Sequence, residues 1–160
     1  MNKIGIIMGS KSDLEIVNET ISILRQFAVS FEIKVLSAHR TPKELVKYVE
    51  DSSKQGVKVF IAAAGMSAAL AGVVAAHTIL PVIGIPIETK NLKGLDSLLS
   101  TVQMPPGVPV ACMAIGKAGA KNAALFALEI LGLSDAKIGA QLLDYKKWLC
   151  LEIKGTKIKL

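Results

Sequence analysis

Five short stretches of the chain are mainly apolar, and longer amphipathic segments separate them. They cover residues 4–8, 31–36, 57–63, 80–87 and 110–115. Short apolar runs of this kind, without strict alternation, are typical of strands buried on both faces of a parallel sheet. We therefore predict five strands at these positions.

The segments between the strands have helical patterns. Leu14, Val17, Ile21 and Leu24 share one face of a predicted helix. The expected helices cover residues 13–27, 42–55, 68–77, 116–133 and 134–152, with a short one around 95–99. Regular alternation of strand and helix predicts an α/β fold with a five-stranded, parallel, doubly wound sheet. We expect one domain over residues 1–160, with the last helix added after the sheet is complete.

Composition adds a prediction about assembly. Of the 160 residues, 51% are hydrophobic but only 4% are aromatic, so aliphatic side chains and alanine supply the excess. Such a composition suits a covered parallel sheet and leaves apolar surface for contacts between subunits. The last helix carries a large apolar face, which either docks on a neighbouring subunit or covers its own sheet. Its apolar residues are Leu142, Leu143, Tyr145, Trp148, Leu149 and Leu151.

Charge and cysteine content argue against several classes of function. The net charge is +6, but much of it comes from five lysines near the C-terminus, at positions 146, 147, 154, 157 and 159. No basic patch is interleaved with aromatic residues, so we expect no nucleic-acid partner. Cys112 and Cys150 are isolated, which predicts buried thiols rather than a disulfide or metal site. We expect no signal peptide and no membrane span, and hence a cytoplasmic protein.

The clearest candidate for chemistry is the hexapeptide of residues 37–42, which includes Ser37 and Ala38. It follows the second strand and precedes a helix, where open α/β sheets bind ligands. His39 is one of only two histidines, and imidazole suits proton transfer near neutral pH. Arg40 can grip a phosphate or carboxylate. The other histidine, His77, lies in an alanine-rich predicted helix, and we interpret it as structural.

Two further loops follow strands and should meet the hexapeptide at the same edge of the sheet. The first offers Gly9, Ser10, Ser12 and Asp13 at a helix start, which is a suitable phosphate site, although it matches neither the P-loop nor the dinucleotide fingerprint. Asp13 either caps the helix or accepts hydrogen bonds from a sugar. The second is a run of small residues that includes Ala64, Gly65 and Met66, where backbone can approach a ligand closely.

Several long segments, in order along nearly the whole chain, resemble the PurE family of purine biosynthesis. They are residues 8–13, 37–42, 96–105, 107–110 and 114–124. The resemblance implies a flavodoxin-like three-layer fold, a homo-octamer, and no metal or organic cofactor. For the class I branch it implies conversion of N5-carboxyaminoimidazole ribonucleotide to the 4-carboxy isomer, by loss and recapture of CO2.

The resemblance also assigns roles to residues. It implies that His39 is the catalytic histidine and that Ser10, Asp13 and Arg40 bind substrate. Together with the loops, the predicted substrate-binding set is Gly9, Ser10, Ser12, Asp13, Ser37, Ala38, Arg40, Ala64, Gly65 and Met66. Small residues would form the site for CO2, namely Ala63, Ala64, Gly65, Ala68 and Ala69.

The chain departs from the class I pattern at one point. Ala69 stands where class I members usually carry a second histidine, and Ala71 replaces a proline. Class II members, which carboxylate aminoimidazole ribonucleotide directly with CO2, also tend to lack this histidine. Residues 40–42 and 102–105 resemble class I, so the mutase is our main prediction, with His39 as the single titrating catalytic group. A receiver or flavin carrier is disfavoured, because the third strand ends without acidic residues and aromatics are scarce.

Overall fold

The strands form one parallel sheet in a computed structural model that describes residues 3–156. The strands are β1 (Lys3–Met8), β2 (Ser30–Val35), β3 (Val57–Ala64), β4 (Val82–Pro86) and β5 (Ala111–Cys112). Their order across the sheet is β2-β1-β3-β4-β5, the flavodoxin-like order. The predicted five-stranded parallel sheet is confirmed.

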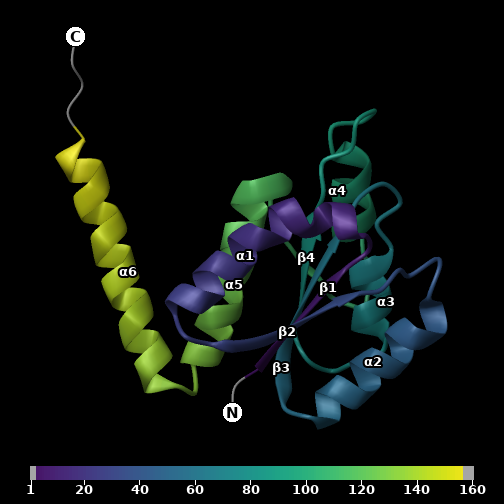
Figure 1. The fold of residues 1–160 in the computed structure, drawn as a ribbon, viewed down its shortest axis with the longest axis horizontal. Coiled ribbons are helices and arrows are strands. Elements are labelled where there is room, and N and C mark those ends of the chain that lie inside the picture. The colour runs from purple at the N-terminus through teal and green to yellow at the C-terminus, as the bar shows by residue number, and fades with distance from the viewer. Residues whose placement is uncertain (1–2, 157–160) are drawn as a thin grey trace.

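Helices cover both faces of this sheet and make a three-layer structure (Figure 1). The helices are α1 (Leu14–Gln26), α2 (Pro42–Lys54), α3 (Leu70–Ala76), α4 (Leu95–Val102), α5 (Gly116–Gly132) and α6 (Ala136–Gly155), and a 3₁₀ turn, η1 (Lys11–Asp13), precedes α1. Helices α1 and α5 lie on one face, and α2 and α3 lie on the other. The predicted layering is therefore also confirmed.

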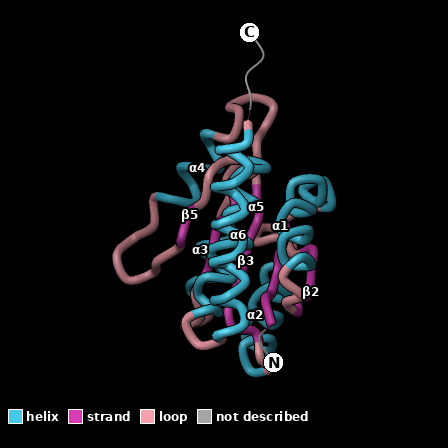
Figure 2. Tube along the Cα trace, turned by 90° about the vertical axis from the view of Figure 1, so that its left-hand side faces the viewer, coloured by secondary structure: helices cyan, strands magenta, loops and turns pink. Residues whose placement is uncertain are grey.

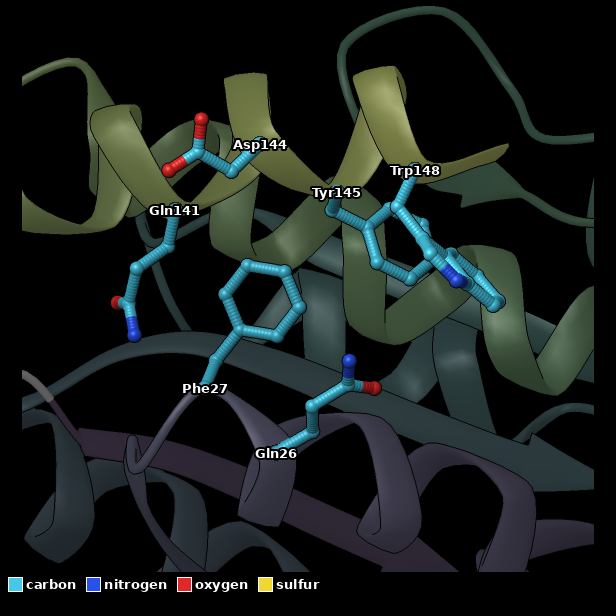
Figure 3. A pocket seen from close by; sticks show the side chains of 6 residues that line it. All are labelled: Gln26, Phe27, Gln141, Asp144, Tyr145 and Trp148. Atoms are coloured by element: carbon cyan, nitrogen blue, oxygen red, sulfur yellow. The ribbon is translucent and has the colours of Figure 1, made fainter. Parts of the chain in front are cut away.

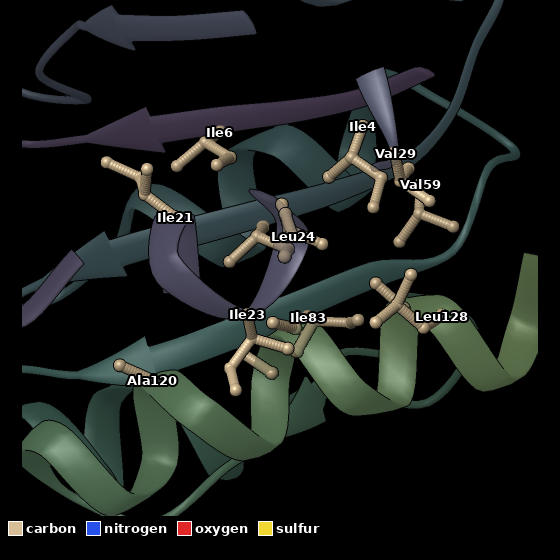
Figure 4. Packing of buried hydrophobic residues seen from close by; sticks show 14 of the residues in the cluster. Ile4, Ile6, Ile21, Ile23, Leu24, Val29, Val59, Ile83, Ala120 and Leu128 are labelled. Carbon is tan, nitrogen blue, oxygen red and sulfur yellow. The ribbon is translucent and has the colours of Figure 1, made fainter. Parts of the chain in front are cut away.

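The two faces of the sheet bury separate apolar clusters because side chains alternate along each strand. Ile4 and Ile6 of β1 pack with Leu24 of α1 and Leu128 of α5 (Figure 4). The intervening Ile7 belongs to the cluster under α2 and α3. All of these side chains are almost completely buried, so both faces of the central strands contribute to the core.

The elements differ from the predicted ones mainly at their ends. The predicted strand of residues 110–115 is a strand over only two residues, Ala111 and Cys112, which pair with Ile83 and Gly84 of β4 at the edge of the sheet. Helix α3 starts at Leu70, two residues later than predicted. Helix α1 starts after η1, which is a separate turn closed by Ser10 and Asp13.

Helix α6 starts beside α5 and diverges from the body of the molecule toward its C-terminal end (Figure 1). Seen from its own side, it runs along the outside of the fold (Figure 2). Ile138 and Leu142 are its buried residues, whereas Leu143 and Leu151 are more than 60% exposed. The helix therefore does not cover the sheet, and most of its apolar face has no partner within residues 3–156.

An open aromatic groove lies where α6 meets the end of α1 (Figure 3). The ring of Tyr145 makes an edge contact with Phe27, with 5.8 Å between the ring centroids, and the centroid of Trp148 lies 5.5 Å from that of Tyr145.

Cys150, further along α6, is exposed, and Cys112 is partly buried, so the prediction of buried thiols is wrong for Cys150. Of the five C-terminal lysines, Lys157 and Lys159 lie outside the described residues.

Candidate functional site

One cavity of about 820 Å³ lies at the carboxyl ends of four neighbouring strands. The loops after β1, β2, β3 and β4 all contribute to its lining. The predicted catalytic histidine and every residue predicted to bind substrate line it, namely Gly9, Ser10, Ser12, Asp13, Ser37, Ala38, His39, Arg40, Ala64, Gly65 and Met66. The structure thus brings together residues that are up to 57 positions apart in the sequence, from Gly9 to Met66.

The loop after β1 is held in shape by its own side chains. The Ser10 backbone N–H donates to Asp13 Oδ2 at 3.1 Å, and the Ser12 N–H donates to Ser10 Oγ at 3.3 Å. The Ser12 hydroxyl donates to Ser10 Oγ at 2.9 Å. This reciprocal capping satisfies N–H groups at the start of η1 and fixes both hydroxyls at the cavity.

The turn after β2 is closed by Thr41 and leads directly into α2. Thr41 Oγ1 accepts from the Ser37 N–H at 2.8 Å and donates to the Ser37 carbonyl at 3.2 Å. Pro42 then occupies the first turn of α2, where its missing N–H is tolerated. His39 is held in the middle of this closed turn, on the lining of the cavity.

Arg40 links the loops after β1 and β2. Its Nη2 donates to the Gly9 carbonyl at 2.9 Å, and its Nε donates to Ser37 Oγ at 3.4 Å. These bonds use two of the five guanidinium N–H donors, so the others remain for an anion. The guanidinium is therefore held at Gly9, the start of the loop that carries Ser10 and Ser12.

Asp13 is the buried charged group of the site, with 7% of its surface exposed. Burial raises the pKa of its carboxyl above the ordinary value, while the Ser10 N–H, the Ser12 hydroxyl and the nearby Arg40 charge act in the opposite direction. Asp13 caps the turn and lines the cavity at the same time, so both alternatives left open by the sequence are compatible with its position.

The loop after β3 forms an apolar part of the lining. Ala64, Gly65, Ala68 and Ala69, four of the five small residues predicted to lie at the site, line the cavity. Ala63 does not, because its side chain points into the core and is fully buried. His77 lies at the end of α3, outside the cavity, with Nδ1 3.9 Å from Glu50 Oε1.

The loop after β4 is the part of the site that the sequence analysis missed. Glu88, Thr89 and Lys90 line the cavity opposite the loops that carry the motifs. No local motif marks them. The available signal was their position directly after a strand, since the carboxyl ends of parallel strands share one edge.

The described part of the chain, residues 3–156, provides neither a metal site nor a membrane span. No group of three or more His, Cys, Asp or Glu side chains in this range is arranged to hold a metal ion. None of the helices in the same range has the length and apolar character needed to cross a bilayer.

Comparison with known proteins identifies relatives that match nearly the whole chain. The chain is 48% identical, over 99% of both chains, to a protein of Saccharolobus solfataricus named N5-carboxyaminoimidazole ribonucleotide mutase. It is 54% identical to a protein of the same name from Pyrococcus abyssi, over 92% of this chain and 83% of that one. The crystal structure of Treponema denticola PurE superposes with a TM-score of 0.86 at 28% identity, covering 96% of this chain and 94% of the other.

A family match covers almost the whole of the fold, including all four loops of the cavity. It extends over residues 3–150 and corresponds to the family described as AIR carboxylase. Together with relatives of about 50% identity along nearly the full chain, this match shows that the protein is a member of the AIR carboxylase family.

Proposed function

We propose that this protein is an N5-carboxyaminoimidazole ribonucleotide mutase of purine biosynthesis. The observation that carries the proposal is the meeting of His39 and Arg40 with the capped loop of residues 9–13 in one cavity. This arrangement combines a group that transfers protons with groups that bind a phosphorylated sugar. Relatives of 46–54% identity carry the name of this activity.

The phosphate and sugar are bound at the loops after β1 and β2. The 5′-phosphate accepts hydrogen bonds from the hydroxyls of Ser10 and Ser12 and from Arg40, close to the start of η1 and α1. Asp13 accepts hydrogen bonds from ribose hydroxyls. The remaining lining residues, Gly9, Ser37, Ala38, Ala64, Gly65 and Met66, shape the space for the nucleotide.

His39 carries the proton transfers. The C–N bond to the carboxylate breaks, CO2 leaves, and protonated His39 donates its proton to N5. Carbon C4 of the ring then attacks CO2 to form a C–C bond. Neutral His39 takes the proton from C4, which restores aromaticity and regenerates the acid. One imidazole thus acts first as an acid and then as a base, and these steps use no cofactor.

The released CO2 must stay in the site until C4 attacks it. Ala64, Gly65, Ala68 and Ala69 provide an apolar wall without groups that would hydrate CO2 or bind it covalently. Substitution of Ala68 or Ala69 by a larger side chain would fill that space. Retention of a small neutral intermediate is thus a property of the loop after β3.

One observation favours a second candidate function. Ala69 lines the cavity at the position of the usual second histidine, and direct carboxylases of this family also tend to lack it. The two activities are separated by assaying purified protein with N5-carboxyaminoimidazole ribonucleotide and with aminoimidazole ribonucleotide plus CO2, each at low bicarbonate. Turnover of the first substrate without added CO2 supports the mutase. Turnover that occurs only with aminoimidazole ribonucleotide and CO2 contradicts it.

The role of His39 is tested by His39→Asn. The variant should bind the nucleotide within a fewfold of wild type while its turnover falls by about a hundredfold or more, because it removes the group that transfers the protons. His77→Asn is the matched control and should keep full activity, since His77 lies outside the cavity. Weak nucleotide binding with normal turnover would refute the assignment.

We also propose a homo-octamer that acts in the cytoplasm. Support for assembly comes from α6, on which Leu143, Trp148 and Leu151 remain exposed in a single chain. An exposed apolar face of this kind is typical of a contact between subunits. The cytoplasm is where a phosphorylated biosynthetic intermediate is made and consumed.

A further inference from the structure

Lys90 lines the cavity from the loop after β4, on the wall away from Arg40. We infer that Lys90 binds the carboxylate group of the nucleotide, both on N5 in the substrate and on C4 in the product. The inference rests on the proposed mutase function. It assigns a specific partner to a residue that lies outside every motif of the chain.

The backbone around Lys90 is fixed on both sides. The Ile87 N–H donates to the Ala64 carbonyl at 2.9 Å, which continues the pairing of β3 and β4 beyond the strand ends. The Thr89 hydroxyl bonds to the Asp96 carboxylate at 3.0 Å, and the Lys93 N–H donates to the Thr89 carbonyl at 3.0 Å. These bonds hold the start of the Lys90 side chain at the edge of the cavity.

The loops after β3 and β4 are also packed tightly against each other. A Cβ atom on Gly65 would lie 3.3 Å from Thr89 Cγ2, which is closer than ordinary contact distance. Glycine at this position therefore allows the loop that carries Lys90 to lie directly against the small residues proposed to hold CO2. Lys90 is consequently adjacent to the part of the site where the carboxylate leaves and returns.

The order of the strands separates Lys90 from Arg40. Their loops follow β4 and β2, which are three steps apart in the sheet, or about 14 Å at the usual strand spacing. A phosphate bound near Arg40 and a carboxylate bound near Lys90 would thus lie at the two ends of an extended nucleotide. His39 lies next to Arg40 on the loop after β2. The imidazole ring of a nucleotide bound between this loop and the loop after β4 can therefore be reached by residues of both loops.

The nucleotide carries two anionic groups, so its binding needs a second cationic side chain besides Arg40. Asp13 and Glu88 are acidic, and Arg40 and Lys90 are basic, so these four side chains sum to zero. The nucleotide brings a phosphate of nearly two negative charges and a carboxylate. Arg40 already bonds to Gly9 and Ser37, whereas no ion pair of Lys90 occurs within residues 3–156. Lys90 is therefore the available cation for the second anionic group.

The test compares Lys90→Ala with Lys93→Ala, which removes the same charge from the same loop but at a residue that does not line the cavity. Lys90→Ala should raise the KM for the carboxylated nucleotides about tenfold with little change in kcat, because it removes an interaction present in both ground states. Lys90→Arg should restore most of the affinity. Lys93→Ala should behave as wild type.

Aminoimidazole ribonucleotide, which has the same phosphate and ribose but no carboxylate, separates the possible roles of Lys90. Its inhibition constant should be the same for wild type and Lys90→Ala, and this binding also shows that the variant is folded. Three results would each overturn the inference. The first is a KM of Lys90→Ala equal to that of wild type, and the second is an equal rise in KM for Lys93→Ala. The third is a loss of affinity for aminoimidazole ribonucleotide as large as the loss for the carboxylated nucleotides. Failure of wild type to convert the N5-carboxylated nucleotide would instead overturn the proposed function.

Discussion

Asp13 combines a structural and a binding role in one carboxylate. It accepts the N–H of Ser10 and so shapes the loop after β1, yet it is buried at a cavity that must also receive an anionic ligand. Burial raises the pKa of this carboxyl, which means that its ionised form is less favourable in the folded protein than in the unfolded chain. The ionised carboxylate therefore costs stability, which fits the proposed role of Asp13 in binding ribose hydroxyls.

Asp13→Asn should therefore weaken binding without weakening the fold. A raised folded-state pKa stabilises the protein at pH values below the ordinary value of 3.8, and this contribution is lost as the pH rises through the folded-state value. At neutral pH the melting temperature of Asp13→Asn should equal or exceed that of wild type, and the difference should shrink on acidification. The KM for nucleotide should rise about tenfold, because a ribose hydroxyl loses a charged acceptor.

Thermal melts of wild type and Asp13→Asn from pH 4 to pH 8 check the first part. A wild-type protein that gains stability over Asp13→Asn as the pH rises would contradict the argument, because it would show that the carboxylate stabilises the fold.

Individual site residues were predictable where a local pattern marked them. His39 and Arg40 stand out because a rare imidazole and a guanidinium are adjacent at the end of a strand. Lys90 has no such signal, since one lysine among many on a basic chain carries no local information. Its place in the cavity depends on hydrogen bonds to Asp96 and Ala64 by its neighbours, which only the folded chain reveals.

Helix α5 shows how closely the elements approach one another behind the site. Gly119, in its first turns, is buried, and a Cβ atom there would lie 1.6 Å from the carbonyl oxygen of Ala114. The Ala114 carbonyl, in the turn between β5 and α5, therefore occupies the space that a side chain at position 119 would need.

Gly119→Ala should lower the free energy of unfolding by about 1–3 kcal/mol, because the backbone of Ala114 must move to admit the methyl group. Gly139→Ala is the matched control within α6, where the nearest atom to an added Cβ is 3.6 Å away. That control should be neutral or slightly stabilising, as expected for alanine in a helix. Urea unfolding followed by circular dichroism measures both, and equal stability of the two variants would contradict the close contact.

The elements were predictable in kind and less so in extent. Apolar runs and helical periodicity located all five strands and the order of the elements. The length of β5 was not predictable, because the apolar residues 110–115 look like any buried strand, whereas the number of paired residues depends on how far the folded chain stays alongside β4. The separate turn η1 depends likewise on reciprocal bonds between Ser10 and Asp13.

At the scale of the whole molecule, the apolar surface gathers on a helix far from the cavity. Leu151 and Ile153 are exposed by 67% and 77%, and they lie on the part of α6 that diverges from the body (Figure 1). The proposed assembly would bury this surface. The cavity is built by loops of one chain, so changes to α6 test assembly without altering residues of the site.

A chain with both Leu151→Glu and Ile153→Glu should fail to reach the octamer, because charges would be buried at the contact. The exposed charge change Lys154→Glu is the control and should leave assembly intact. Sedimentation velocity measures the size of each variant. An octamer formed by the double variant, or by a chain truncated before Lys146, would show that α6 is not required for assembly.

The position of α6 after the sheet and the other helices in chain order has a consequence for synthesis. The sheet, the helices that cover it and every residue of the cavity precede residue 136, so they leave the ribosome before the apolar stripe of α6 does. Because folding proceeds from the N-terminus during translation, the sheet and the helices that cover it can begin to fold before the exposed apolar residues of α6 leave the ribosome. The exposed apolar residues of α6 are therefore the last part of the described chain to become available for the proposed contact between subunits.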